Sequence, residues 1–591
     1  MKKSSFVPII CSLLCILLGP FTAAENTSKE QITAPVSEKQ AAVFYFYWYD
    51  VFSGLHFYDN NGKDSFTDHP PPVQIDNYSY RDISWHTSEL KAMMEAKIDI
   101  VLPVYWGNDG CLFWSQSGLK KLVKAVEKLS GEGHDTPRIG MFFDTTSLQS
   151  QNKGKLPDLT KTRGRKLFYR MISDFYSLIP KKMWARVDNK PLIYLYSSTF
   201  VSNYNQKCFD FVYRNFKNDF GVKPFIVKET SWKNITADGV YSWGASLYGA
   251  TVFGRIGNLG PGYDDTACNR SQTRIKDRVY GDFYAAGWEK MIGTGVTLVT
   301  IETWNEWHEG SEIANSQEYK KKYLKMTAEY IELWKRTDYS TAPNVWFKPG
   351  INQHISGLWP IDTIENKSWT IKTIENRESF FQSDRSKPET HGLYLDINDS
   401  FLHSEREMVW ITVEYFDRGN NSWFFVYDSA SDFPKNSSSI LLRNTRKWKQ
   451  HTLKLTDTYL GGRLDWGADL ILKTKHTKEP VYFGRIWISK QPPVNQAPNL
   501  QRIKDQSLKA GRSVDIPIYI SDPEKDTVSL NLLRDIPFTK IVKKEDELFV
   551  LKISPSKQDI RSHPYLVLIH LQDEGTPPLS DIETFSVFIK K

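Results

Sequence analysis

Residues 302–310 gather acidic, amide, imidazole and indole side chains into one short stretch, which reads ETWNEWHEG. Glu306 and Glu309 lie three positions apart, so one helical turn after a strand would place their Cβ atoms about 5–6 Å apart. Two carboxyl groups at that spacing hold their proton affinities apart, so that one donates a proton while the other accepts one. The pattern predicts acid–base chemistry on a bound molecule, with Trp304 and Trp307 as a wall for sugar stacking.

Two other interpretations of this stretch deserve comparison. A helix-capping acidic turn would carry the same residue types, and the sequence leaves that alternative open. A metal site is not expected, because His308-Glu309 is not accompanied by a second histidine at the spacing that zinc sites use. We therefore predict no metal and no cofactor for catalysis.

The elements that would position this stretch are short apolar runs alternating with helical patterns over residues 41–340. Six runs predict strands: Ala42–Tyr47, Ile98–Pro103, Ile139–Phe143, Leu192–Tyr196, Pro224–Val227 and Val296–Ile301. The helix candidates between them are Glu89–Ala96, Leu119–Leu129, Thr162–Ser177, Cys208–Phe216 and Tyr319–Lys335. The alternation and its length predict a (β/α)8 TIM barrel, with one further strand near residues 239–245. A doubly wound open sheet is the alternative, but no glycine-rich phosphate fingerprint follows the first strand.

In a β/α barrel, functional groups lie where strands pass into the following loops, and the 302–310 stretch directly follows the last predicted strand. The same criterion adds Tyr47, Trp106 and Asp144 as substrate-binding candidates after earlier strands. Trp106 and Asp144 lie at the strand-to-loop junction, whereas an aromatic strand residue such as Tyr47 is more often part of a core.

A glycine-rich stretch at residues 243–270 predicts a long loop, and loops of that length are often functional. Tyr263 and Arg270 are candidates to close over a substrate. The alternative is a purely structural role, in which Arg270 only pairs with Asp264 or Asp265.

The run ETWNEWHEG, continued by Ser311-Glu312-Ile313, resembles the signature of glycoside hydrolase family 99, the endo-α-mannosidases and endo-α-mannanases. The resemblance extends over roughly half of the chain, although only this motif is specific. It implies a (β/α)8 barrel in which Asn305, Glu306 and Glu309 are active-site groups, with Glu302 as a further active-site glutamate. Trp307 and His308 of the same motif are then expected among the substrate-binding residues.

The resemblance also implies an unusual mechanism, in which the anomeric configuration is retained without a protein nucleophile. Glu306 would act as general base on the 2-hydroxyl of the sugar, whose oxygen attacks the anomeric carbon to give a 1,2-anhydro sugar. Glu309 would act as general acid to the leaving oxygen and then as base for water. Such participation by the substrate is an exception to the usual two-carboxylate scheme.

Beyond the barrel, the pattern predicts two modules of β-strands. Residues 353–490 show period-two runs typical of a β-sandwich, for which a carbohydrate-binding role and a spacer role stay open. Its candidate stacking residues are Trp423, Tyr427, Trp448, Trp466 and Trp487. After a proline-rich linker at 491–498, residues 499–591 resemble an immunoglobulin-like or cadherin-like module. Its acidic turn Asp522–Asp526 could hold a structural calcium ion, or could simply be exposed.

The amino terminus predicts export. Residues 1–24 have a basic start, an apolar run too short for a membrane span and small residues before a cleavage point, which is typical of a signal peptide. Residues 25–40 form a polar spacer. We expect a secreted or periplasmic/cell-surface protein without a membrane span after signal removal. One disulfide and one free thiol could form from Cys111, Cys208 and Cys268.

Composition narrows the function further. Removal of Lys2 and Lys3 leaves 74 Lys and Arg against 69 Asp and Glu, and this formal charge of +5 does not suggest a nucleic-acid partner. The aromatic content of 14% suits cores and carbohydrate platforms alike. The sequence favours a secreted hydrolase that is endo-acting on an α-mannose-containing polysaccharide or glycan. A retaining hydrolase of another α-linked polysaccharide and a non-catalytic glycan-binding surface protein are the alternatives.

Overall fold

The computed structural model describes residues 38–58, 66–67, 71, 77–107, 113–268, 270–350, 354–361, 369–375, 377–382, 392–475, 479–575 and 578–591. The predicted signal peptide (1–24), almost all of the spacer and Cys111 lie outside these residues. Cys208 and Cys268 are free thiols. In the described part of the chain, no helix has the length and apolar character needed to cross a bilayer.

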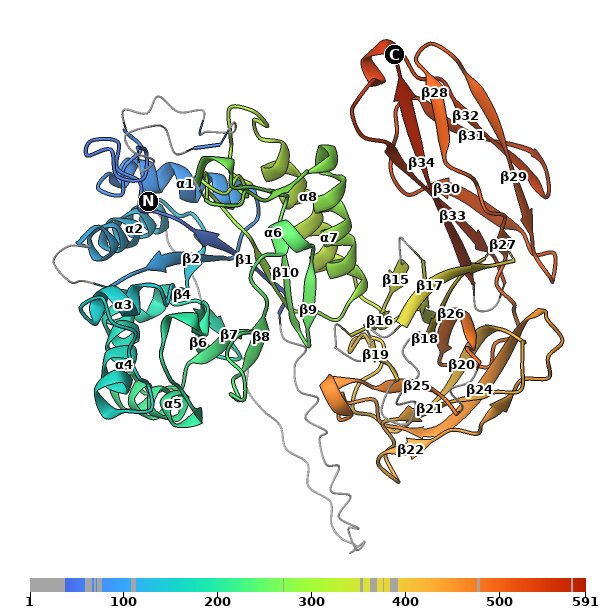
Figure 1. Ribbon diagram of the computed structural model, residues 1–591, viewed down its shortest axis with the longest axis horizontal. Helices are drawn as coiled ribbons and strands as arrows, with labels where there is room; N and C mark the ends of the chain where they lie inside the picture. The colour runs from blue at the N-terminus through green and yellow to red at the C-terminus, as the bar shows by residue number, and fades with distance from the viewer. Residues whose placement is uncertain are drawn as a thin grey trace, which may run out of the picture. The chain divides into compact units, whose positions relative to one another are not determined.

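The amino-terminal half is built on one sheet whose central strands run parallel (Figure 1). In chain order these strands are β1 (Gln40–Tyr45), β2 (Ile100–Tyr105), β4 (Met141–Phe143), β6 (Lys190–Leu195), β7 (Phe225–Glu229), β8 (Gly239–Tyr241), β10 (Ile256–Leu259) and β13 (Leu298–Ile301). Hydrogen bonds join them in the order β8-β7-β6-β4-β2-β1-β13-β10. The two end strands lie against each other, because a Cβ added at Gly239 would be 3.1 Å from Ile256. The sheet is therefore nearly closed, as in a barrel.

Short strands extend this sheet, and a further pair of strands forms a small sheet of its own. They are β3 (Arg138–Ile139), β5 (Arg186–Val187) and β9 (Thr251–Phe253), together with the separate pair β11 (Tyr263–Asp264) and β12 (Ile275–Lys276).

Helices alternate with the parallel strands, as the sequence predicts. Eight α-helices are present within the described residues: α1 (Ile83–Glu95), α2 (Phe113–Gly131), α3 (Ser147–Gln151), α4 (Thr162–Ser177), α5 (Gln206–Phe220), α6 (Ala245–Tyr248), α7 (Asp282–Gly293) and α8 (Lys322–Arg336). Helix α4 shows why they pack on the sheet: Phe168, Met171, Ile172 and Phe175 recur at helical spacing and are all buried. This arrangement fits the predicted (β/α)8 barrel better than an open doubly wound sheet.

One barrel strand lies where the sequence predicted only a loop. Strand β10 falls inside residues 243–270 and forms a hairpin with β9 before it pairs in parallel with β13. It has four residues, one of which is Gly257, so no alternation of side chains marks it in the sequence. Pairing with β13 defines this strand, and such pairing is a tertiary feature.

The next part of the chain consists of two sheets that share one apolar core. The first sheet contains β14 (Asn344–Lys348), β15 (His354–Ser356), β17 (Trp369–Ile374), β18 (Arg377–Gln382), β20 (Glu407–Phe416), β24 (Trp448–Thr458) and β26 (Tyr482–Ser489). The second contains β16 (Leu358–Pro360), β19 (Leu393–Ile397), β21 (Ser422–Tyr427), β22 (Lys435–Asn436), β23 (Ile440–Leu441) and β25 (Leu470–Thr474). Two layers around one core are typical of a sandwich.

The final part of the chain also forms two sheets around a core of its own. One contains β27 (Asn499–Leu500), β29 (Val514–Ser521), β31 (Thr539–Glu545) and β32 (Leu548–Ile553). The other contains β28 (Gln506–Lys509), β30 (Val528–Leu532), β33 (Tyr565–Asp573) and β34 (Ser580–Lys590).

A close approach of main chains at the end of β10 yields a test of the barrel. A Cβ at Gly260 would lie 2.4 Å from the carbonyl oxygen of Glu302 and 1.9 Å from the Ser246 hydroxyl. Gly260→Ala must push main chain apart, and we expect destabilisation by about 1–3 kcal/mol. The matched control is Gly131→Ala at the end of α2, where a Cβ meets nothing within 4 Å. Thermal unfolding midpoints of the two variants check this, and equal midpoints would contradict it.

Candidate active site

The loop after β13 is fastened to the end of β1 by one amide side chain. Asn305 accepts a hydrogen bond from the Phe46 amide at 2.8 Å and donates one to the Phe46 carbonyl at 2.8 Å. Asn305 has no exposed surface. Both ends of its amide are therefore used to position the loop.

The two tryptophans of the motif are buried and do not form the predicted stacking wall. Trp304 is 0% exposed and donates its indole N–H to Glu89 at 2.5 Å. Trp307 is 1% exposed and donates to the Tyr78 hydroxyl at 2.8 Å. Burial raises the pKa of Glu89 to about 7. Each indole thus anchors the loop through its polar tip and fills the core with its ring.

Glu302 is likewise surrounded by protein donors. Its carboxyl group is bonded by the Gly244 amide at 3.0 Å, the Ser246 amide at 3.4 Å and the Asn258 side chain at 2.6 Å. Burial raises its pKa to about 8, against the opposing effect of these hydrogen bonds. Glu302 therefore ties β13 to β10 and to the segment after β8.

Glu306 has a different environment. It is 3% exposed, and its Oε1 lies 2.7 Å from His308 Nδ1. Its Oε2 is buried and has no hydrogen-bond partner within the described structure. The Thr303 hydroxyl accepts from the Glu306 amide at 2.9 Å and holds the turn. A buried carboxyl oxygen left without a partner is rare in proteins and is available to a ligand donor.

Glu309 is held by a guanidinium group. Arg270 Nη2 lies 2.6 Å from Glu309 Oε1, and the Asp264 amide donates to the Glu309 carbonyl at 2.7 Å. Burial raises the pKa of Glu309, the negative charge of Glu306 raises it further, and Arg270 opposes both. The two carboxyl groups are therefore close enough to influence each other, although a turn and not a helix separates them.

Arg270 contacts the neighbouring acid as well as Glu309. Its Nη1 lies 2.7 Å from Asp265 Oδ2 and donates to the Tyr263 hydroxyl at 2.7 Å. Of Asp264 and Asp265, which the sequence offered as partners of Arg270, the structure thus selects Asp265. This carboxylate also pairs with Arg274. Tyr263 is 6% exposed, so its ring belongs to this network. Its pKa is raised by burial and by the charge of Glu309.

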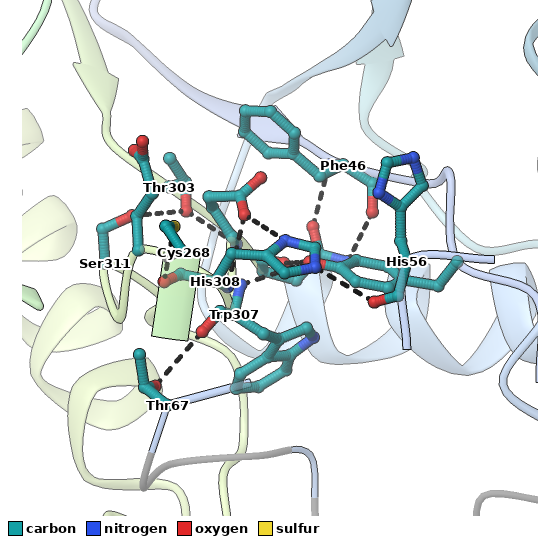
Figure 2. A network of polar contacts seen from close by, with 12 residues as sticks. Phe46, His56, Thr67, Cys268, Thr303, Trp307, His308 and Ser311 are labelled. Atoms are coloured by element: carbon teal, nitrogen blue, oxygen red, sulfur yellow. Dashed lines mark hydrogen bonds and ion pairs between the residues drawn. The ribbon is translucent and has the colours of Figure 1, made fainter. Parts of the chain in front are cut away.

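His308 lies at the centre of the polar network in Figure 2, between the Thr303–Ser311 turn and His56. Besides its contact with Glu306, its Nε2 lies 3.0 Å from the His56 carbonyl oxygen. Its ring stacks on Tyr49, with centroids 5.6 Å apart. The Cys268 thiol donates to the His308 carbonyl at 3.2 Å.

The candidates from earlier strands divide into two groups. Trp106 is partly exposed and donates its indole N–H to Asp144 at 2.7 Å. Asp144 is 7% exposed, and burial raises its pKa. The structure does not bring Tyr47 to the site, because it is fully buried and its hydroxyl donates to the Ser115 carbonyl at 2.7 Å.

Further residues lie near these candidates. Trp48 follows the first strand, where the strand-end criterion selects it as it selects Trp106. It is partly exposed, stacks on His56 with centroids 4.5 Å apart and meets His308 edge to face. The sequence analysis missed Trp243, which is partly exposed and stacks on Phe142. The His56 contribution is a main-chain carbonyl, for which the sequence carries no signal.

The predicted aromatic strip of the sandwich is mostly buried. Trp423, Tyr427 and Trp487 are at most 3% exposed, whereas Trp466 is 54% exposed. Phe433 is 45% exposed and lies under the guanidinium of Arg463. A sugar-binding role of this part stays a prediction, and Trp466 is the candidate that the structure leaves accessible.

Comparison with known proteins identifies one family model and related enzymes. The model described as a domain of unknown function, DUF5010, matches residues 29–345. The glycoprotein endo-α-1,2-mannosidase of Mus musculus is 39% identical over 59 residues, which are 10% of this chain and 13% of the mouse protein. That of Rattus norvegicus is 37% identical over 59 residues, with the same coverage of 10% and 13%. The chain thus spans only 13% of these curated relatives.

Among solved structures, the GH99 endo-α-mannosidase from Bacteroides thetaiotaomicron is similar, with 18% sequence identity and a TM-score of 0.38. The match covers 51% of this chain and 98% of that one. The resemblance to endo-α-mannosidases that the motif predicted is confirmed by the two curated relatives, over the 59 residues that they match.

Removal of the guanidinium group beside Glu309 tests the electrostatics of the site. In Arg270→Met, the ionised form of Glu309 loses its cation, so the pKa of Glu309 should rise further. Carboxyl ¹³C NMR titration of Glu-labelled protein, with Glu309→Gln for assignment, measures this. Arg274→Met is the control, because Arg274 contacts Asp265 in the same network. An unchanged titration in Arg270→Met would contradict the assignment.

Proposed function

We propose, from the premise that this chain belongs to the DUF5010 family, that it is a glycoside hydrolase acting within α-mannose-containing polysaccharides or glycans. The observation that carries the proposal is a pair of neighbouring carboxyl groups in unlike environments, one buried and the other with its side chain 18% exposed. Glu306 keeps one buried oxygen without a protein partner. Glu309 has a raised pKa and a guanidinium partner. One group is thereby suited to accept a proton and the other to donate one.

In the first step, Glu306 Oε2 takes the proton of the sugar 2-hydroxyl, and the 2-oxygen attacks the anomeric carbon. The bond from that carbon to the glycosidic oxygen breaks as Glu309 gives its proton to the leaving oxygen. The products are a 1,2-anhydro sugar and the released chain. This step needs no protein nucleophile. The burial of Glu306, which is 3% exposed, agrees with a role as base and not as nucleophile.

In the second step, Glu309 takes a proton from water, and the water oxygen attacks the anomeric carbon. The epoxide bond opens, and the proton on Glu306 returns to the 2-oxygen. Two inversions give net retention of configuration. The environment of Glu309 suits both of its roles: burial keeps the proton on before the first step, and Arg270 stabilises the carboxylate after it.

Contacts with the sugar rings would come from aromatic side chains near these carboxyl groups. Trp48, Trp106 and Trp243 are partly exposed, and Asp144 fixes the indole of Trp106. Indole faces suit the apolar faces of sugars. The preference for mannose rests on the curated relatives, which are named endo-α-1,2-mannosidases.

Export is part of the proposal and rests on residues 1–24, whose composition is that of a signal peptide. A secreted or surface location would bring the enzyme to polysaccharide outside the cell. The sandwich is proposed as an accessory sugar-binding part, on the exposure of Trp466.

Substitution of each catalytic candidate tests the function. We expect Glu306→Gln and Glu309→Gln each to lower the release of reducing ends from yeast α-mannan by about 10²–10⁴-fold, because each removes a positioned proton carrier. Circular dichroism should stay unchanged. The control is Glu318→Gln, which alters an exposed glutamate nearby in the chain and should retain activity. Proton NMR of the first product should show the α-anomer.

Three outcomes would count against this function as proposed. Full turnover in either Gln variant would remove that residue from the mechanism. Binding of α-linked glycans without any release by the wild-type protein would favour a glycan-binding protein. Release from another α-linked polymer but not from mannan would move the substrate to that polymer.

A structural calcium ion in the final module is also proposed, and the residues there fit one. Asp573 is 2% exposed and its Oδ2 has no hydrogen-bond partner in the described part of the chain. The same holds for the buried Oδ2 of Asp522, whose charge raises the pKa of Asp573 beyond the effect of burial. Among the described residues no group of three His, Cys, Asp or Glu is arranged as a metal site. Calcium would therefore use these two carboxylates with neutral oxygen ligands.

Calcium should raise the unfolding midpoint of the wild-type protein, because an ion that binds only the folded state adds about 2.7 kcal/mol at a hundredfold excess over Kd. Asp573→Asn should abolish this increase. Asp546→Asn, at a carboxylate that is 99% exposed, should preserve it. Differential scanning calorimetry with CaCl2 and with EGTA decides, and equal midpoints in both would show that no ion binds.

A further inference from the structure

The ring of His308 has a polar partner at each nitrogen. Nε2 lies 3.0 Å from the main-chain carbonyl oxygen of His56, and Nδ1 lies 2.7 Å from Glu306 Oε1. The His308 amide also donates to Glu306 Oε1, at 3.3 Å. Figure 2 shows His308 beside His56.

The chemistry of these partners constrains where the protons are. A carbonyl oxygen only accepts hydrogen bonds, so Nε2 must carry a proton that it donates to His56. A neutral imidazole with its proton on Nε2 has a lone pair on Nδ1. The contact between Nδ1 and Glu306 Oε1 then needs one more proton, either on the carboxyl group or on Nδ1. The second choice makes an imidazolium–carboxylate pair.

We propose that His308 is a positioning residue that carries a proton on both ring nitrogens and so holds Glu306 as a carboxylate, with Oε2 turned to the substrate. This inference rests on the proposed function, in which Glu306 must begin the reaction without a proton. The main-chain carbonyl of His56 selects the orientation of the ring. His308, which was predicted to bind substrate, thus acts through the general base Glu306.

The surroundings of the ring support this protonation state. Among the described residues, the titratable groups that contact His308 include Glu306, Tyr49, His56 and Cys268, and the charges of Glu309 and Asp144 act on Glu306. Tyr49 and Cys268 stay neutral, since burial raises the pKa of each, that of Cys268 to about 12. The carboxylate of Glu309 is paired with the guanidinium group of Arg270. The cation at His308 therefore lies against the Glu306 carboxylate, 2.7 Å from its Oε1.

In the reaction, His308 transfers no proton to the sugar. The proton of the 2-hydroxyl goes to Glu306 Oε2 while the 2-oxygen bonds to the anomeric carbon, and Oε1 stays bonded to Nδ1–H. When the epoxide opens, the same proton leaves Oε2 for the 2-oxygen. His308 keeps both of its protons through the cycle and holds Oε2 in one orientation.

The protonation state can be measured without any substrate. In ¹⁵N-His-labelled protein at pH 7, we expect both ring nitrogens of His308 to show imidazolium shifts, assigned by their loss in His308→Asn. In Glu306→Gln, the ring should become neutral with its proton on Nε2. His86 is an internal reference, because burial lowers its pKa to about 4 and keeps it neutral.

Activity measurements on variants of His308 separate the effect of its ring charge from that of its hydrogen bond to Glu306. His308→Asn places an amide N–H where Nδ1 lies, which preserves a neutral donor to Glu306. We expect the acid limb of the pH–rate profile to move up by about one to three pH units, because the positive charge beside the base is lost. His308→Ala should also lose at least about tenfold on the plateau, because Oε2 is no longer oriented. His86→Asn, a second buried histidine of the barrel, should leave the profile in place.

Two results would overturn the inference. A neutral His308 ring in the wild-type protein at pH 5–8 would assign the proton to Glu306 instead. An acid limb that does not move in His308→Asn would show that the charge of the ring has no effect on the base. Because the NMR measurement needs no turnover, an absence of glycosidase activity would contradict the proposed function and leave the ion pair separately testable.

Discussion

The candidate site depends on how one loop is joined to the first strand of the barrel. Strand β1 pairs with β13 up to Val43 and Ile301. The Trp304 amide continues the pairing by donating to the Phe44 carbonyl at 2.8 Å. At Phe46 the loop main chain has turned away, and the amide of Asn305 supplies the missing donor and acceptor. An aspartate in that place would lack the donor, so only an amide can extend the pairing in both directions.

This attachment allows carboxyl groups to be packed close together. Glu302, Glu306 and Glu309 come from eight consecutive positions, and each is given different partners. Neutral donors surround Glu302, an imidazole contacts Glu306, and a guanidinium pairs with Glu309. Because like charges in a buried place disfavour one another, these partners determine which carboxyl group stays ionised. The proposed division into one acid and one base thus rests on the surroundings and not on the glutamates themselves.

Aromatic residues contribute mainly as scaffolding here. The hydroxyl of Tyr49 bonds to the Asn305 carbonyl at 3.0 Å and accepts from the Trp307 amide at 3.2 Å. Tyr78 accepts from the Trp307 indole. Such side chains fill the core with a ring and satisfy main-chain groups with a polar tip, which a loop of this shape requires. The aromatic content therefore reflects support for the site at least as much as contact with a ligand.

The alternation of strands with helices and the place of the acidic motif follow from the sequence by itself, because apolar periodicity and the strand-end rule are local properties. It also predicted the family resemblance, which resides in nine consecutive residues. The tertiary structure alone decided that Trp304, Trp307 and Tyr47 are buried, that Arg270 pairs with Glu309 and Asp265, and that β10 is a strand. Those outcomes depend on which distant segments meet, and burial, pairing and proton positions arise only from such contacts. The carbonyl of His56, a group that every residue carries, shows this most clearly, since only the folded chain brings it to His308.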